Sequence, residues 1–188
     1  WYNGDASRQV VNDEVSGTLK GSPDSHVLSF YGETGYRFAL TDTASMTPFA
    51  GLSIATATLE GFTEKDHGGT GAALKVGDSD ANSTESNLGL RFETAMAMGS
   101  GVFTPTLSLA WEHEFGDTVQ DVSMRFAEAP SGGNFTVISA ETPRDSALIN
   151  AGASYTIGAS AEMGLYYTGR FNEEYTAQSV TARFSYRF

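Results

Sequence analysis

Seven charged residues stand in segments whose alternate positions are otherwise rich in Gly, Ser, Thr and Asn. Carboxylate and guanidinium groups form strong, charge-assisted hydrogen bonds when they face one another. If the seven share one side of a sheet, they can neutralise one another and stiffen it, or they can form the hydrophilic wall of a wet passage. The residues are Glu33, Arg91, Glu93, Glu112, Arg170, Arg183 and Arg187.

The histidines offer a second, weaker kind of chemistry. His26, His67 and His113 have no partner at the i+2 or i+4 spacing that metal sites use. His113 stands beside acidic residues and could meet Ser108 as the dyad of an enzyme acting on lipid, so we keep an enzyme using His113 or His67 as a minor alternative. The chain has no cysteine, which excludes disulfides, thiolate zinc sites and a thiol nucleophile.

The acidic segment 78–82 resembles the start of a calcium-binding loop. Ser83 stands where an EF-hand needs glycine, and Gly89 stands where it needs the bidentate glutamate. The glycine-rich segment 68–71 lacks the lysine of a phosphate-binding loop. We therefore expect no metal and no cofactor.

The charge balance restricts the partners. Acidic residues outnumber lysine and arginine 23 to 11, which gives a formal net charge of -12 over 188 residues. Nucleic-acid binding needs an excess of positive charge, so we expect no nucleic-acid partner. A polybasic membrane anchor is excluded for the same reason. The longest apolar run, Ala95 to Met98, is too short for a transmembrane helix.

The segments that carry the charged residues have a period of two, which predicts an all-β protein. At the chain end Val180, Ala182, Phe184, Tyr186 and Phe188 alternate with polar residues. Working backwards from there predicts eight strands, at about residues 8–20, 26–39, 47–60, 85–98, 102–115, 145–157, 160–171 and 176–188. Long polar connections at 61–84 and 116–144 alternate with short turns, so the long loops share one end of the sheet.

Alternation alone does not say which face meets water. In a soluble sandwich the apolar side is the core, whereas in a transmembrane β-barrel it faces lipid and the polar side lines the interior. The polar positions hold small residues and charges of both signs rather than the many lysines and glutamates of a solvated surface. This composition favours an antiparallel transmembrane β-barrel of the outer-membrane type.

A terminal phenylalanine with apolar residues at every second preceding position resembles the C-terminal signal of outer-membrane proteins, which the barrel-assembly machinery recognises. Val180, Ala182, Phe184, Tyr186 and Phe188 carry that resemblance. It implies the lipid bilayer of the outer membrane and the assembly machinery as partners.

In order and spacing, several short segments resemble the translocator β-domain of autotransporters, the type V secretion systems of Gram-negative bacteria. The resemblance implies a non-enzymatic outer-membrane barrel that exports a passenger polypeptide carried in cis, with the seven charged residues along its polar interior. The matching segments are 33–38, 48–52, 61–64, 72–74, 87–91, 109–117, 144–148 and 184–188.

The family implies a 12-stranded barrel, an even number typical of this class. Because eight strands are predicted, we expect residues 1–188 to be a single barrel domain or the C-terminal part of one, with the first strands missing. Eight strands can also close by themselves, with an interior filled by side chains. A small outer-membrane barrel of structural or adhesive type is therefore the alternative.

Overall fold

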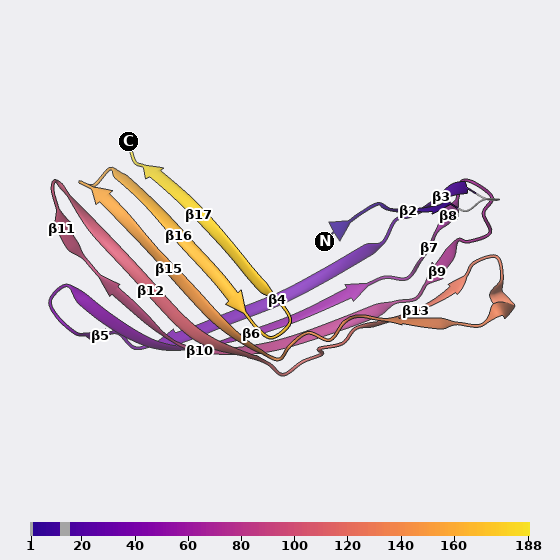
Figure 1. Cartoon of the computed structure of the whole chain (residues 1–188), viewed down its shortest axis with the longest axis horizontal. Coiled ribbons are helices and arrows are strands. Elements are labelled where there is room, and N and C mark those ends of the chain that lie inside the picture. Colours follow the sequence, from indigo (N-terminus) through magenta and orange to yellow (C-terminus); the bar gives the residue numbers. More distant parts are fainter. Residues whose placement is uncertain (1, 12–15) are drawn as a thin grey trace. The chain divides into compact units, whose positions relative to one another are not determined.

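The computed structural model describes residues 2–11 and 16–188 (Figure 1). Apart from one 3₁₀ turn, Pro130–Gly132, all regular structure in these residues is β-strand, and every strand pair with a defined register is antiparallel. The largest sheet has the order β1-β4-β6-β10-β12-β15-β16-β17. Along that path each strand pairs with the next long strand of the chain, which is an up-and-down topology. The all-β, antiparallel prediction is confirmed.

The chain divides into two compact units that are interleaved in sequence. Unit 1 consists of residues 1–30, 54–83 and 116–142, and unit 2 of residues 31–53, 84–115 and 143–188. The strands β4 (Asp24–Gly35), β6 (Ala44–Leu59) and β10 (Ser79–Thr94) contribute residues to both units.

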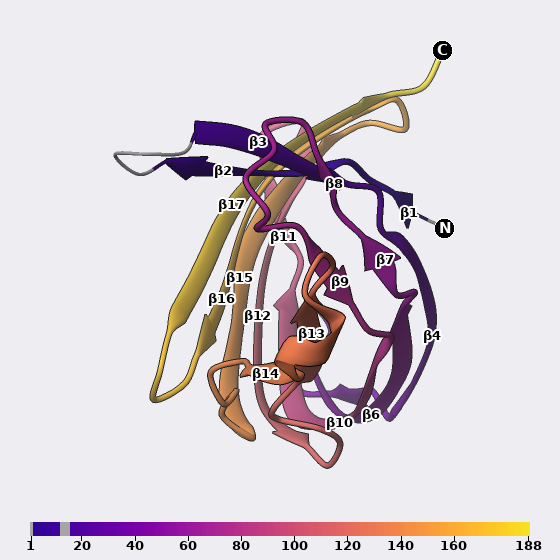
Figure 2. The same ribbon diagram turned by 90° about the vertical axis from the view of Figure 1, so that its right-hand side faces the viewer.

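Unit 2 is a curved antiparallel sheet. Its complete long strands are β12 (Gly101–Glu114), β15 (Asp145–Ile157), β16 (Ala161–Phe171) and β17 (Thr176–Tyr186). The short β5 (Phe38–Ala39) and β11 (Met96–Met98) pair with β6 and β12. Within this unit the sheet curls from β17 through β15 and β12 to β10 as a half-barrel (Figure 2).

Unit 1 contains two smaller sheets, built from the region predicted as one strand over residues 8–20 and from the predicted long connections 61–84 and 116–144. One has the order β2-β3-β8, with β2 (Ala6–Val11), β3 (Ser16–Gly21) and β8 (Lys65–Asp66). The other has the order β14-β13-β9-β7, with β7 (Phe62–Thr63), β9 (Leu74–Val76), β13 (Asp121–Phe126) and β14 (Phe135–Ile138). The two-residue β1 (Tyr2–Asn3) pairs with β4.

Seven of the eight predicted strands correspond to β4, β6, β10, β12, β15, β16 and β17. The prediction of a single strand over residues 8–20 is wrong: β2 and β3 form a hairpin in which Ala6 lies opposite Gly21 and Val11 opposite Ser16. Residues 12–15 lie outside the described residues. A period of two has the same appearance in one long strand and in two short antiparallel strands, so the pattern could not distinguish them.

The boundary of β10 also differs from the prediction. This strand begins at Ser79, several residues before the expected residue 85, and adds polar residues to its N-terminal end. In the part of the chain that the structure describes, no helix has the length and apolar character needed to span a membrane.

Several large apolar side chains of unit 2 are exposed, whereas several of its polar side chains are buried. Val180, Leu165 and Phe184 are 67%, 59% and 69% exposed. By contrast, Glu112 and Ser108 are only 8% and 9% exposed. Among the described residues the buried apolar side chains are Leu19, Ala73 and Val76, which all belong to unit 1. The sheet of unit 2 is therefore inverted relative to a water-soluble sandwich, as the transmembrane prediction requires.

Candidate functional site: the polar face of the curved sheet

The strand register sorts the side chains of unit 2 onto two faces. Residues directly opposite one another in an antiparallel pair project to the same side, so one row across the sheet contains Arg91, Ser108, Asn150, Thr168 and Ser179. We call the side with this row the polar face.

The opposite side carries the row Phe92, Leu107, Ala151, Tyr167 and Val180. We call it the apolar face. The predicted alternation is thus kept in register across β10, β12, β15, β16 and β17.

Arg170 is the centre of the most buried charged group on the polar face. Its Nη2 lies 2.9 Å from Oε1 of Glu85 and also forms an ion pair with Glu112. Glu112 is buried, while Arg170 and Glu85 are partly exposed. One guanidinium therefore bridges carboxylates from two other strands, β10 and β12. Two carboxylates brought this close repel each other unless a cation lies between them.

A second group joins Glu33 of β4 to Arg91 of β10. The Arg91 Nη2 lies 3.3 Å from Glu33 Oε1, and the Tyr31 hydroxyl donates a hydrogen bond of 2.8 Å to Glu33 Oε2. The guanidinium carbon of Arg91 also stands 4.7 Å above the Phe49 ring. These contacts hold the arginine by charge and by a cation–π interaction together.

The remaining predicted residues are arranged differently. Glu93 pairs with Arg37 at 3.5 Å, and both side chains are largely exposed. Arg183 lies over the Tyr166 ring, with 5.8 Å between the guanidinium carbon and the ring centre. The backbone N–H of Arg187 donates to Ser160 O, beyond the end of β17. Within the described residues, neither Arg183 nor Arg187 takes part in an ion pair.

The structure thus brings together Glu33 with Arg91 and Glu112 with Arg170. Arg37, Tyr31 and Glu85 also take part in these contacts, although the sequence pattern did not single them out. Glu85 could have been found from the strand period, because every second residue of a strand faces the same side. Glu85, Arg91 and Glu93 are all at odd positions of one strand and therefore share a face. The contact of Arg37 with Glu93 has no local signal, since Arg37 lies in the link between β4 and β5 and Glu93 lies far away in the sequence, on β10.

The structure does not bring His113 to Ser108, the contact that the minor enzyme alternative needs. The two residues are an odd number of positions apart on the regular strand β12, so they project from opposite faces. His113 Nδ1 instead lies 2.8 Å from Asp145 Oδ1, and the indole N–H of Trp111 donates to the same oxygen at 2.8 Å. This cluster lies on the apolar face, at the end of the strands.

The other two histidines belong to unit 1. His26 Nε2 lies 3.0 Å from Glu60 Oε1, and the backbone N–H of His67 donates to Thr18 O at 3.1 Å. Among the described residues no group of three or more His, Cys, Asp or Glu side chains is placed to hold a metal ion.

The apolar positions of the C-terminal segment project together from β17. Val180, Ala182, Phe184 and Tyr186 lie opposite Tyr167, Leu165, Met163 and Ala161 of β16, all on the apolar face. Phe184 and Tyr186 are 69% and 60% exposed, and Phe188 follows the end of the strand. An exposed stripe of this kind is where lipid or a protein partner would make contact.

Comparison with known proteins agrees with this architecture. The model of the autotransporter beta-domain family matches residues 1–168. The "uncharacterized protein in trpE-trpG intergenic region" of Pseudomonas putida is 30% identical over 128 residues, which are 68% of this chain and 20% of that protein. The chain therefore spans about a fifth of the length of the curated relative it matches.

The family match covers most of the strands whose polar and apolar faces are described above. Autotransporter β-domains are outer-membrane translocator barrels, and the inverted, curled antiparallel sheet of this chain has the features of such a barrel. The chain belongs to the autotransporter β-domain family.

Proposed function

We propose that this chain forms the wall of an outer-membrane translocator barrel whose polar face lines the route of an unfolded passenger segment to the cell surface. The observation that carries the proposal is the inversion of the sheet: its polar face holds buried Glu112 and Ser108, while its apolar face exposes Leu165 and Val180. An exposed apolar face of this extent is costly in water and stable in lipid.

The charged groups of the polar face suit a passage more than a binding site. Arg170 is paired with Glu85 and Glu112, and Arg91 with Glu33, so each of these two cations already has a counter-charge. A polypeptide that moves past such a wall meets polar groups without strong single-sign attraction. Transit requires contacts that are favourable on entry and weak enough to release.

We also propose that the barrel-assembly machinery inserts the chain through β17. In the described residues β17 ends the strand order and pairs with β16 alone, so its outer edge has free hydrogen-bonding groups. Such an edge is not tolerated in lipid and must be covered by another strand. Further strands of the same polypeptide, or of a partner during insertion, are suited to cover it.

A small structural or adhesive barrel is the second candidate. Unit 1 favours it, because the two small sheets pack Leu19, Ala73 and Val76 away from solvent. A folded module in the long connections offers a specific surface for other molecules. The two functions differ in whether a passenger crosses the polar face.

The proposal can be tested with single cysteines, because residues 1–188 contain none. Cysteine is introduced at Thr168 or Ser179 on the polar face, and at Leu165 or Val180 on the apolar face, in the full-length protein in its bacterial host. All four wild-type side chains are exposed, which makes the two pairs matched. A folded domain fused to the passenger should stall it in transit. The stalled passenger should then crosslink to the polar-face cysteines only.

Reaction with a charged maleimide gives the control for orientation. The polar-face cysteines should react in intact cells without a passenger, and the apolar-face cysteines should be protected by the bilayer. Crosslinks at Leu165 and Val180, or none at any position while the passenger is exported, would contradict the translocator proposal. Normal labelling without any passenger export would favour the structural or adhesive barrel.

A further inference from the structure

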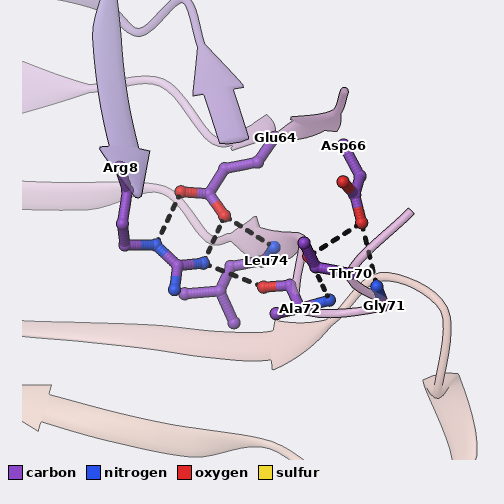
Figure 3. A network of polar contacts seen from close by, with 7 residues as sticks. All are labelled: Arg8, Glu64, Asp66, Thr70, Gly71, Ala72 and Leu74. Atoms are coloured by element: carbon purple, nitrogen blue, oxygen red, sulfur yellow. Dashed lines mark hydrogen bonds and ion pairs between the residues drawn. The ribbon is translucent and has the colours of Figure 1, made fainter. Parts of the chain in front are cut away.

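The three-stranded sheet of unit 1 separates its charges onto two faces. Arg8 and Asp66 both lie opposite Leu19, which is fully buried, so these three residues share one face. Arg8 Nη2 lies 2.7 Å from Glu64 Oε2 and 2.8 Å from the Ala72 carbonyl oxygen (Figure 3). The charge of Arg8 is therefore balanced by Glu64 within unit 1.

Asp66 is engaged in the same way. Its carboxylate accepts hydrogen bonds from the backbone N–H groups of Gly68 and Gly71 and from the Thr70 hydroxyl, each at 2.9 Å. Glu64 accepts a further bond from the Leu74 N–H at 2.9 Å (Figure 3). Neither carboxylate is therefore left to neutralise a cation on the other face.

The other face brings two lysines together. The register of β3 with β8 places Lys20 directly opposite Lys65, and the register of β2 with β3 places Ser7 opposite Lys20. Like charges directly opposite in an antiparallel pair destabilise the sheet. In the part of the chain that the structure describes, neither lysine forms an ion pair. The protein has only three lysines, so this pairing is not a consequence of a lysine-rich surface.

These lysines line a cavity of about 640 Å³. Ser7 and His67 add polar groups to the wall, and Phe62 adds an apolar surface. Asp5 is the carboxylate among the lining residues, and its Oδ1 accepts a hydrogen bond of 3.2 Å from Ser22 Oγ. Binding pockets for small ligands have volumes of roughly 300–1,000 Å³. The cavity is thus large enough for a sugar-sized molecule with one charged group.

We propose that the cavity between Lys20, Lys65 and Phe62 binds a phosphate monoester of sugar size. A phosphate monoester carries about -1.5 to -2 charges at pH 7, which matches two ammonium groups, and three oxygens that accept hydrogen bonds. The Ser7 hydroxyl supplies a further donor beside Lys20, and the Phe62 ring bounds the uncharged part of the ligand. A bound anion would also remove the repulsion between the two lysines.

The same chemistry is available from two sources, a soluble sugar phosphate and the phosphorylated glycan headgroup of a lipid. The first probe is glucose 6-phosphate, titrated calorimetrically into the full chain purified in detergent, with glucose as the uncharged control. The second is a set of vesicles with and without a lipid bearing a phosphorylated disaccharide headgroup, to which detergent-purified protein is added.

Lys20→Gln and Lys65→Gln should each weaken binding by at least about tenfold, as expected for loss of one charge-assisted hydrogen bond. Lys75→Gln is the matched control, because it removes the same charge from unit 1 at β9, outside this cavity. It should change the affinity less than twofold. All three side chains are exposed, so the substitutions leave the buried residues of the module in place.

If glucose 6-phosphate binds, and binds more weakly to Lys20→Gln and Lys65→Gln but not to Lys75→Gln, the ligand is a soluble sugar phosphate. If only the vesicles with the phosphorylated lipid bind with these differences, the ligand is a lipid headgroup. Equal losses for Lys75→Gln and Lys65→Gln would show diffuse charge attraction and overturn the proposal. Absence of binding to both probes would overturn it as well. None of these outcomes bears on passenger export.

Discussion

Arg91 and Glu33 meet on the polar face although 58 positions separate them in the chain. Their contact, 3.3 Å from Nη2 to Oε1, joins the early strand β4 to the middle strand β10. It is a partly exposed pair, with 44% of the arginine side chain and 27% of the glutamate side chain accessible. Its position on the polar face makes it a direct probe of the proposed interior.

We expect Arg91→Gln to lower the free energy of unfolding by no more than about 1 kcal/mol, because solvent screens a partly exposed ion pair. Glu33→Gln should have an effect of similar size. A double-mutant cycle in urea, with the protein in lipid vesicles, measures the coupling between the two side chains. Additive effects would show that the contact contributes no coupling energy.

Arg170→Gln should be more damaging than Arg91→Gln. Glu112 is buried beside Arg170, and loss of the cation leaves it and Glu85 facing each other without compensation. Removing one partner of a buried charge pair costs about 3–5 kcal/mol. Urea unfolding in vesicles should therefore show a clear loss for Arg170→Gln, and adding Glu112→Gln should recover part of it. A further loss in the double variant would contradict the bridging role of Arg170.

Gly152→Ala should hinder the packing of β15 against β16. A Cβ at this position would lie 2.4 Å from Tyr166 Cδ1 and 3.1 Å from the Leu165 carbonyl oxygen, so the aromatic ring would have to move. The expected result is a lower yield of the compact form that runs faster on unboiled than on boiled gels. Combining Gly152→Ala with Tyr166→Leu should restore that form, because the ring is then absent. Equal yields for wild type and Gly152→Ala would refute the clash.

The network around Arg8 predicts that unit 1 loses stability in acid. Burial raises the pKa of Glu64. Hydrogen bonds from Arg8 and the Leu74 N–H, together with the charge of the arginine, lower it by more than burial raises it, so the pKa lies below the ordinary value of 4.5. The Gly68 N–H and other donors likewise hold the pKa of Asp66 below its ordinary value. Carboxylates of this kind stabilise the fold above their unfolded-state pKa.

This contribution should be complete above about pH 5 and should disappear as the pH falls through the lowered pKa values of the folded protein. Hydrogen exchange at the Leu74 amide, which donates to Glu64, reports the change locally. The protection factor of the Leu74 amide is corrected for the intrinsic exchange rate at each pH. It should fall in acid for the wild type, and it should be low and nearly independent of pH for Glu64→Gln. A wild-type protection factor that stays constant from neutral pH to pH 3 would contradict the prediction.

Deletion of Phe188 should reduce assembly of the barrel in the outer membrane. This residue ends the stripe that contains Phe184 and Tyr186, whose side chains are exposed on the apolar face. The amount of heat-modifiable protein in outer-membrane fractions measures assembly. Replacing Arg187 with glutamine is the control, because it changes a neighbouring side chain and leaves the stripe intact. Unchanged levels after deletion of Phe188 would exclude a role for it in assembly.

The sequence by itself determined the strand class and the two-sided character of the sheet. Side chains alternate along any strand, so Val180, Phe184 and Tyr186 had to share a face whatever the neighbouring strands were. The same rule could have excluded a pairing of His113 with Ser108. The short turns, the glycine-rich connections and the alternating apolar stripe of residues 180–188 also predicted an outer-membrane barrel.

Only the tertiary structure decided which charges meet. Arg170 bridges Glu85 and Glu112 because the four strands β10, β12, β15 and β16 align in one register, and register depends on pairing between segments distant in the chain. The hairpin of β2 and β3 was hidden because its period equals that of a single strand. Its pairing with β8 brings Lys20 opposite Lys65, a juxtaposition that depends on long-range hydrogen bonds and that local sequence does not encode.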